Sequence, residues 1–470
     1  MEITPSRRIL SVFMLAMINV SIMASLRNFP LIAQFGLSAV FYFGIVAIFF
    51  LIPSAFVSAE LATGWPKEGG IYIWVREAFG DRWGFFAIWM QWVHNVAWYP
   101  VILSFVGGAI AYIFDPLLAQ NSLFIFAEIL VSFWGMTLFN YTGIKLSGWF
   151  STLGVILGTI IPGSIIIFLG FIWIITGRPI AVSTAAHAVL PSLSNLGDLV
   201  FLAGLFLSFS GMEVSAAYAS DVEKPQRTFP RAILLAAIIT FSLSLLGSMS
   251  VAIIIPKHEI SLVSGVVEAF HLFFNAYHIP AFVPFMAGLL IIGAVAEVNS
   301  WIIGPVRGLH ATSIHGNLPP LFQKVNRHNV PTTLLIFQAL IVTITSLIFL
   351  YMPNVSTAFW ILTVLSAQSY LIMYIILFLA GLKLRYTKPH VPRAYRVPYG
   401  AKGMWFFCTI AIFACIFAIV LGFVPPSDLP IGSLIVYDLI LGISLLIMCG
   451  IPLWIYSRRT PEWYASSSRE

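Results

Sequence analysis

Long apolar runs, separated by short polar connections, repeat along the chain from Ile9 to Tyr456. Each run holds roughly 20 residues, which is enough for an α-helix to cross a hydrocarbon layer about 30 Å thick. We therefore predict about twelve membrane-spanning helices, with no soluble domain between them. The expected spans are 9–34, 38–62, 84–113, 122–142, 149–175, 198–220, 231–255, 282–306, 331–351, 356–381, 403–424 and 433–457.

The composition agrees with this pattern. Hydrophobic residues make up 60% of the chain and charged residues 9%, whereas soluble globular domains hold about 25% charged residues. In lipid every backbone polar group needs an internal hydrogen-bond partner, which a helix supplies. The fold class expected from the sequence is an all-α membrane protein.

Lysine and arginine collect in every second connection, which predicts the orientation of the chain. Cytoplasmic loops hold the excess of these residues because their translocation is resisted. We expect a multi-pass protein of the plasma membrane, or of the inner membrane in a Gram-negative cell, with residues 1–8 and the tail 458–470 both cytoplasmic. The net charge of +6 then faces anionic lipid. No nucleic acid is needed as a partner.

Two spans carry small polar residues in mid-run. They read "INVSIMASLRNFP" in the first span and "LSFSGMEVSA" in the sixth. Each begins a group of five spans, 9–175 and 198–381, and the two groups enter the membrane from opposite sides, with the spans of 403–457 left over. This pattern is typical of inverted-repeat transporters, whose opening helices are broken where substrate binds. The alternative is two unbroken helices with small residues at helix contacts.

Three loops resemble the signature loops of the amino acid, polyamine and organocation (APC) permeases: "ELATGWPKEGGIYIWVREAFGDRWGF", "SDVEKPQRTFPRAI" and "GPVRGLHATSIHGNLPPLFQKVNRHNVPTTLLIFQ". Within this superfamily the nearest likeness is to the glutamate:GABA antiporter family, through "FYFGIVAIFFLIPSAFVSAELATGWPKEGG", "LSFSGMEVSA", "VAIIIPKHEISLVSGVV" and "GAVAEVNSWIIGPVRG". The resemblance implies a LeuT-like fold of two inverted five-helix repeats plus two helices. Substrate would lie between spans 1, 3, 6, 8 and 10.

A zwitterionic amino acid suits such a cavity. The half-helix after the first break directs free N–H groups and a positive dipole end toward a carboxylate. Carbonyl groups released at the second break would receive the ammonium. The carboxylate-side candidates are Ser21, Ile22, Met23, Ala24 and Ser25, and the amine-side candidates are Phe209, Ser210 and Gly211.

Four further side chains match family positions implicated in substrate handling: Glu213, Glu297, Tyr370 and Tyr374. A carboxylate deep in a span needs a partner, a proton or water, so we expect Glu297 to be a substrate-side or proton-carrying group. The two tyrosines share one helix face at i, i+4 spacing, and packing is the alternative for them. Glu60, near the end of the second span, is expected to be structural and to pair with a loop cation.

The chain also departs from the family. Arg27 stands in "SLRNFP", where the glutamate:GABA exchangers carry a stretch with tyrosine and glutamate, and Thr152 stands where relatives place a lysine at a sodium position. Both changes leave substrate and ion coupling open. We expect Arg27 and Glu213 to form a charged pair across the two breaks. The alternative is that Arg27 extends outward and Glu213 only ties the sixth span to its neighbours.

Little in the sequence indicates an enzyme or a cofactor. Cys408, Cys415 and Cys449 all lie in late spans, where small buried side chains are expected. His94 is expected to be a hydrogen-bonded core residue, and the sequence has no metal-ligand cluster or nucleophile motif. We predict a secondary active amino acid transporter, an antiporter working by alternating access, with the bilayer, a small amino acid and protons as partners. The alternatives are a proton- or sodium-coupled amino acid or polyamine symporter, or a transporter-like receptor or channel.

Overall fold

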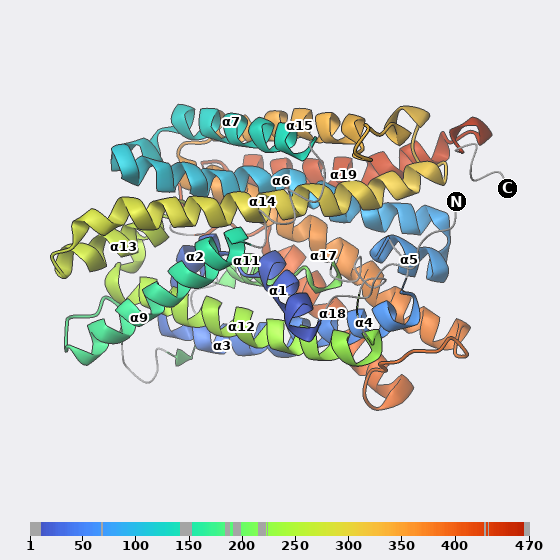
Figure 1. Cartoon of the computed structure of the whole chain (residues 1–470), viewed down its shortest axis with the longest axis horizontal. Coiled ribbons are helices and arrows are strands. Elements are labelled where there is room, and N and C mark those ends of the chain that lie inside the picture. Colours follow the sequence, from blue (N-terminus) through green and yellow to red (C-terminus); the bar gives the residue numbers. More distant parts are fainter. Residues whose placement is uncertain are drawn as a thin grey trace.

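The computed structural model describes residues 11–66, 69–141, 153–183, 189–190, 199–214, 222, 224–426, 429–430 and 432–464. The regular secondary structure of these residues is helical, with turns and loops between the helices and an isolated bridge between His315 and Tyr464. The long helices run side by side in one bundle (Figure 1). The predicted all-α membrane fold is confirmed.

The described part of the chain holds ten helices long and apolar enough to cross a membrane, and a bent pair makes an eleventh. The predicted sixth span is represented by a short apolar helix, α11. The helices are α1 Val12–Met23, α2 Phe29–Ala33, α3 Ala39–Val46, α4 Ile52–Gly64, α5 Ile71–Phe79, α6 Asp81–Phe114, α7 Ser122–Asn140, α9 Ile161–Ile175, α11 Leu202–Ser208, α12 Pro225–Ile254, α13 Gly265–Ala276, α14 Val283–Ile314, α15 Thr332–Ser346, α16 Ile348–Tyr351, α17 Val355–Thr387, α18 Gly400–Leu421 and α19 Leu434–Ser457.

The spans differ in how deeply they are buried in the protein. In both α6 and α17, 83% of the most apolar window is buried, compared with 22% in α7 and 17% in α19. The third and tenth spans therefore form the centre of the bundle, and α7 and α19 form its edge. The division into two inverted repeats and the predicted membrane orientation stay predictions, and Thr152 lies outside the described residues.

The first span is broken as predicted. Its helix α1 ends at Met23, Ala24 and Ser25 have extended backbone, and a 3₁₀ turn, η1 Leu26–Asn28, leads into α2. The two halves are bent by 42°. Pro30 lies in the first turn of α2. The N–H groups of a first turn make no hydrogen bond within the helix, so proline, which has no N–H, costs nothing there. The sequence therefore suits a helix that restarts at this point.

The sixth span is also interrupted. Helix α11 ends at Ser208, and Gly211 follows with φ +113°, a backbone conformation that glycine adopts without strain. A Cβ atom at Gly211 would lie 2.7 Å from Cγ2 of Ile22. Glycine therefore permits both the turn and the close approach of the two breaks. The end of the predicted span, residues 215–220, lies outside the described residues.

Helices α5 and α13 were expected to be loops. They lie at opposite ends of the bundle (Figure 1), and both are too short to cross a membrane. The first turn of α13 packs against the broken first span, since a Cβ at Gly265 would lie 3.0 Å from the Pro30 ring. Both helices are amphipathic, with apolar residues on one face at helical spacing, a periodicity that could have revealed them.

Candidate functional site

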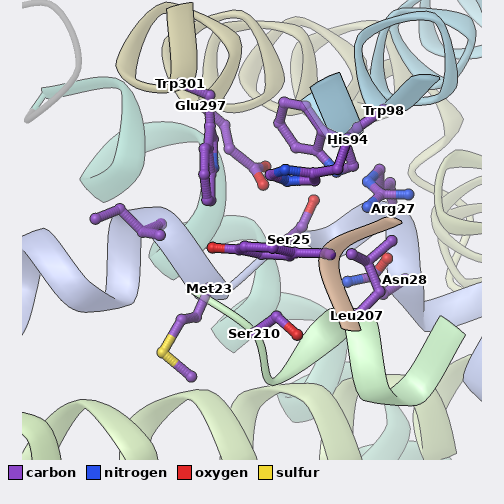
Figure 2. Close-up of a pocket in the computed structure, with 12 residues that line it drawn as sticks. Met23, Ser25, Arg27, Asn28, His94, Trp98, Leu207, Ser210, Glu297 and Trp301 are labelled. Carbon is purple, nitrogen blue, oxygen red and sulfur yellow. The ribbon is translucent and has the colours of Figure 1, made fainter. Parts of the chain in front are cut away.

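A small, partly open cavity of about 20 Å³ lies where the two breaks meet. It is formed by the first broken span together with α6, α11, α14 and α17, as the resemblance implied for these five spans. Its lining residues are Ile22, Met23, Ser25, Arg27, Asn28, His94, Trp98, Leu207, Ser210, Glu297, Trp301 and Tyr370 (Figure 2).

Seven of the thirteen predicted site residues are in this lining: Ile22, Met23, Ser25, Arg27, Ser210, Glu297 and Tyr370. The other six lie around it. The Ser21 hydroxyl donates to the Ile18 carbonyl, Ala24 is a buried residue of the first break, and Phe209 packs edge-on against Phe43. Gly211 brings the breaks together, and Glu213 and Tyr374 form a polar network behind the cavity.

One end of the cavity presents hydrogen-bond donors from the backbone. Ser25 precedes η1, and the first N–H groups of a helix have no acceptor within the helix. Those groups, on Ser25, Leu26 and Arg27, lie at the positive end of the half-helix dipole. Ser25 and Arg27 are both in the cavity lining. This end therefore suits a carboxylate.

Arg27 adds a fixed positive charge. Its side chain is only 2% exposed, and its guanidinium carbon lies 5.4 Å from the centre of the Trp98 ring. Figure 2 shows the two side chains side by side at one end of the cavity. Within the described part of the chain, Nε and Nη1 of Arg27 have no hydrogen-bond partner. The guanidinium thus keeps donors available for a ligand.

Glu297 enters the cavity from α14 (Figure 2). It is 4% exposed, it interacts electrostatically with Arg27, and the Ser25 hydroxyl hydrogen-bonds its carboxyl group. Among the ion pairs of the described residues, Arg27 and Glu297 do not form a direct one. The two charges attract each other across the cavity without contact.

Glu213 is held by a different set of groups. Its Oε1 accepts hydrogen bonds from Gln91 Nε2 at 3.0 Å and from the Tyr370 hydroxyl, and its Oε2 accepts one from the Tyr374 hydroxyl. The Tyr374 oxygen in turn accepts the backbone N–H of Gly211 at 2.7 Å. The carboxyl group therefore ties the second break to α6 and α17.

The predicted ion pair between Arg27 and Glu213 is wrong. Three donors already surround the Glu213 carboxyl, while Arg27 lies against Trp98 and interacts with Glu297. The alternative expectation for Glu213, that it ties the sixth span to its neighbours, is confirmed. Arg27 does not extend outward, because its side chain is buried in the cavity wall.

The sequence analysis missed the aromatic wall of the cavity. His94 was expected to be a hydrogen-bonded core residue, and its Nδ1 does lie 2.6 Å from the Gln91 carbonyl oxygen, yet the ring also lines the cavity and stacks on Tyr370 at 3.8 Å. A signal existed. Trp98 follows His94 by four residues, and Trp301 follows Glu297 by four, so each pair shares a helix face.

The His94 hydrogen bond fixes which ring nitrogen carries the proton in the neutral side chain. A carbonyl oxygen can only accept, so Nδ1 must donate to Gln91. Neutral His94 then has an unprotonated Nε2, which is a hydrogen-bond acceptor. The Ser210 hydroxyl donates to the Phe206 carbonyl at 2.9 Å, so its oxygen also remains an acceptor.

A third buried carboxyl group, Glu60, is fully paired. Its Oε1 lies 2.6 Å from Arg385 Nη1 and 3.4 Å from Arg393 Nε, and its Oε2 accepts the Val397 N–H at 2.7 Å. We call these four residues the Glu60 cluster. It joins the end of α4 to α17 and the segment after it, which confirms that Glu60 pairs with cations as expected.

The three cysteines are unpaired, with Cys408 and Cys415 buried, as expected for small packing residues. Among the described residues no group of three or more His, Cys, Asp or Glu side chains could hold a metal ion.

A family model described as amino acid permease matches residues 10–446. The chain belongs to the amino acid permease family. The permease is 41% identical over 461 residues to an uncharacterized transporter of Legionella pneumophila, covering 98% of this chain and 99% of the relative. It is 31% identical over 454 residues to a glutamate/gamma-aminobutyrate antiporter of Lactococcus lactis, with 95% and 90% covered.

More distant relatives include transporters of a different substrate class. The permease is 25% identical over 378 residues to a protein of Lactococcus lactis named as a probable agmatine/putrescine antiporter, covering 79% of this chain and 78% of that one. The resemblance to the APC permeases is therefore confirmed, and family and relatives are transporters and not enzymes. A multi-pass membrane permease of the amino acid and polyamine class follows, consistent with a LeuT-like fold.

Proposed function

We propose that this permease exchanges amino acids across the membrane by alternating access. The observation that carries the proposal is the cavity between two broken helices, where Arg27 and Glu297 face each other without an ion pair. Charges at membrane depth are expensive unless they have a partner. A zwitterion that bridges them supplies that partner, and so do the free N–H groups of η1.

The two ends of the cavity assign an orientation to the substrate. Its carboxylate would bind the N–H groups at Ser25, Leu26 and Arg27. Its ammonium would bind acceptors on the other helices: the Glu297 carboxylate, His94 Nε2 and Ser210 Oγ. Exchange by rocking of one part of the bundle around this site is the usual mechanism of transporters with broken helices, and the antiporter relative supports exchange.

A proton-coupled symporter is the second candidate. Glu297 is a buried carboxyl group without a direct ion pair in the described part of the chain. Because an ionised carboxylate at that depth is costly, Glu297 would take up a proton before the substrate binds and release it after the substrate leaves, while His94 Nε2 and Ser210 Oγ receive the ammonium. In this reading each transport step carries one proton in the same direction as the substrate.

Reconstitution in proteoliposomes separates the candidates. Vesicles loaded with glutamate, γ-aminobutyrate or alanine, or left empty, are given labelled glutamate outside. We expect saturable uptake into the loaded vesicles and little into the empty ones. Uptake into empty vesicles driven by an imposed pH gradient would instead identify a symporter, and unsaturable flux would identify a channel.

A matched pair of variants tests the role of the cavity in this assay. Glu297→Gln removes the carboxylate from the amine end, and Glu268→Gln makes the same change on α13, outside the cavity. We expect the first variant to lose exchange while the second keeps it. Equal activity of the two variants would contradict the assigned site.

A further inference from the structure

We propose that Arg27 sets the charge selectivity of the permease, so that the cavity accepts an amino acid with a second carboxylate and rejects a diamine. The proposal rests on the exchange function above and adds the substrate class. It would also distinguish this chain from the relative named as a probable agmatine/putrescine antiporter. Overall sequence identity alone does not decide which substrate class this chain carries.

The first argument is the unmet hydrogen-bonding capacity of Arg27. A guanidinium has five N–H donors and no acceptor, and it stays protonated in proteins. In this chain Nε and Nη1 are buried without a partner in the described residues. Leaving a buried donor unsatisfied is unfavourable, and a carboxylate matches adjacent guanidinium donors in a two-pronged arrangement. The geometry therefore favours an anionic ligand group at Arg27.

The second argument is that Arg27 is held in the cavity wall. The guanidinium lies 5.4 Å from the centre of the Trp98 ring, within the range of a cation–π contact, and its side chain is only 2% exposed. Glu297 attracts it without forming an ion pair with it. Since the Arg27 guanidinium stays in the cavity wall, a second ammonium on the substrate would be repelled by it in a medium of low dielectric.

The third argument is that the acceptors lie apart from these donors. Glu297, His94 Nε2 and Ser210 Oγ serve one ammonium, and the N–H groups of η1 serve one carboxylate. A dicarboxylic amino acid uses the acceptors, η1 and Arg27 together. A diamine binds only the acceptors. It leaves the N–H groups of η1 and the guanidinium of Arg27 without a hydrogen-bond partner, so the cavity disfavours it.

The experiment measures binding separately from transport. Purified full-length permease is titrated with glutamate, alanine or putrescine, and the ligand-induced rise in unfolding temperature gives the apparent affinity. We expect the wild type to bind glutamate more tightly than alanine and to show no response to putrescine. Arg27→Gln should weaken glutamate binding by about 10- to 100-fold and remove the discrimination against putrescine.

Two further variants keep the result interpretable. Arg27→Lys retains the charge and loses the two-pronged geometry, so it should still reject putrescine while binding glutamate more weakly. Arg27→Gln combined with Glu297→Gln leaves neither charge buried alone and serves if the single variant does not fold. This double variant should show no preference between glutamate and alanine.

The outcomes distinguish the two proposals. Tight putrescine binding by the wild type, or an unchanged glutamate-to-putrescine ratio in Arg27→Gln, would overturn the role of Arg27 even if amino acid exchange is observed. Absence of exchange in proteoliposomes alongside the expected binding pattern would overturn the exchange function and leave the selectivity of Arg27 standing.

Discussion

The cavity and the Glu60 cluster both bury charged side chains. The charges of the Glu60 cluster form direct ion pairs, whereas Arg27 and Glu297 in the cavity do not. Glu60 is 1% exposed and Glu297 is 4% exposed, so burial does not separate them. Glu60 contacts two arginines and a backbone N–H, whereas Glu297 faces Arg27 across a space. Since buried polar groups are normally satisfied within the protein, unmet capacity is the better sign of a ligand site.

Glu213 is an intermediate case that sharpens the comparison. It lies beside the cavity, yet its carboxyl oxygens are occupied by Gln91, Tyr370 and Tyr374. By the same criterion its first role is to hold the second break in place. A family match to a substrate-handling position is thus compatible with a residue that positions the site without contacting the ligand.

The largest expected effect is on transport by Arg27→Gln. Truncating one partner of a buried charge pair removes about 2 to 5 kcal/mol from a binding interaction, so exchange of glutamate should fall by about 30-fold or more. The unfolding temperature should change little, because the removal of a buried guanidinium with unsatisfied donors is offset by the loss of its attraction to Glu297. Flux and unfolding are measured on the same preparation. A large loss of stability with normal flux in the folded fraction would show that Arg27 has a structural role and does not bind the substrate.

Glu60→Gln should give the opposite pattern. Removing one member of a buried ion pair leaves Arg385 and Arg393 without their counter-charge, and the expected loss is about 3 kcal/mol of unfolding free energy. The apparent KM for glutamate should not change, because Glu60 is not in the cavity lining. The check is denaturant unfolding beside initial rates of exchange. An altered KM with unchanged stability would show that the Glu60 cluster acts in transport and does not stabilise the fold.

The two tyrosines test the intermediate case. Tyr374 donates to Glu213 and accepts the backbone N–H of Gly211, which would be left without an acceptor if the hydroxyl were removed. Tyr370 donates to Glu213 and interacts with the side chain of Gln91, which keeps its own hydrogen bond to Glu213. Tyr374→Phe should therefore lower the unfolding free energy more than Tyr370→Phe, with each lost bond contributing about 1 to 3 kcal/mol. The measurement is thermal unfolding of both variants without substrate. Equal losses would show that the Gly211 bond does not hold the second break.

The smallest effect is expected outside the membrane, at Glu268 on α13. Burial, and next the nearby charge of Glu259, raise the pKa of Glu268 from 4.5 to about 7. Because the folded-state pKa is the higher one, the stabilising contribution is present below pH 4.5 and is lost as the pH rises through 7. Glu268→Gln should unfold about 2 °C higher than the wild type at pH 8 and at the same temperature at pH 4.5. A difference in unfolding temperature between the two proteins that is largest at acid pH would contradict a raised pKa for Glu268.

The sequence predicted the spans because their signal is local. The length of each apolar run and the alternation of cations are read directly from neighbouring residues, and the predicted span 433–457 corresponds to α19 at Leu434–Ser457. The breaks were found for the same reason, since "MAS" and "FSG" interrupt apolar runs. Helices α5 and α13 were missed because they are short and partly polar.

The arrangement of the site could not be predicted as well. Which carboxyl group faces Arg27 depends on how α14, α6 and α17 are rotated about their axes, and donors more than 100 residues away along the chain, such as Gln91 and Tyr374, occupy Glu213. His94, Trp98 and Trp301 were overlooked because an aromatic residue in an apolar span resembles ordinary packing. Only tertiary contacts show that these three line a cavity.

The most direct test of the account is a structure of the permease with its transported amino acid bound, determined at a resolution that shows side chains. We predict the substrate between Arg27 and Glu297, with a carboxylate on the N–H groups that begin η1 and an ammonium toward His94. Substrate found elsewhere, for example in the second cavity of about 10 Å³ lined by Asn140, Arg307 and Asn329, with Arg27 and Glu297 unengaged, would contradict the claim that unpaired buried charges mark the transport site.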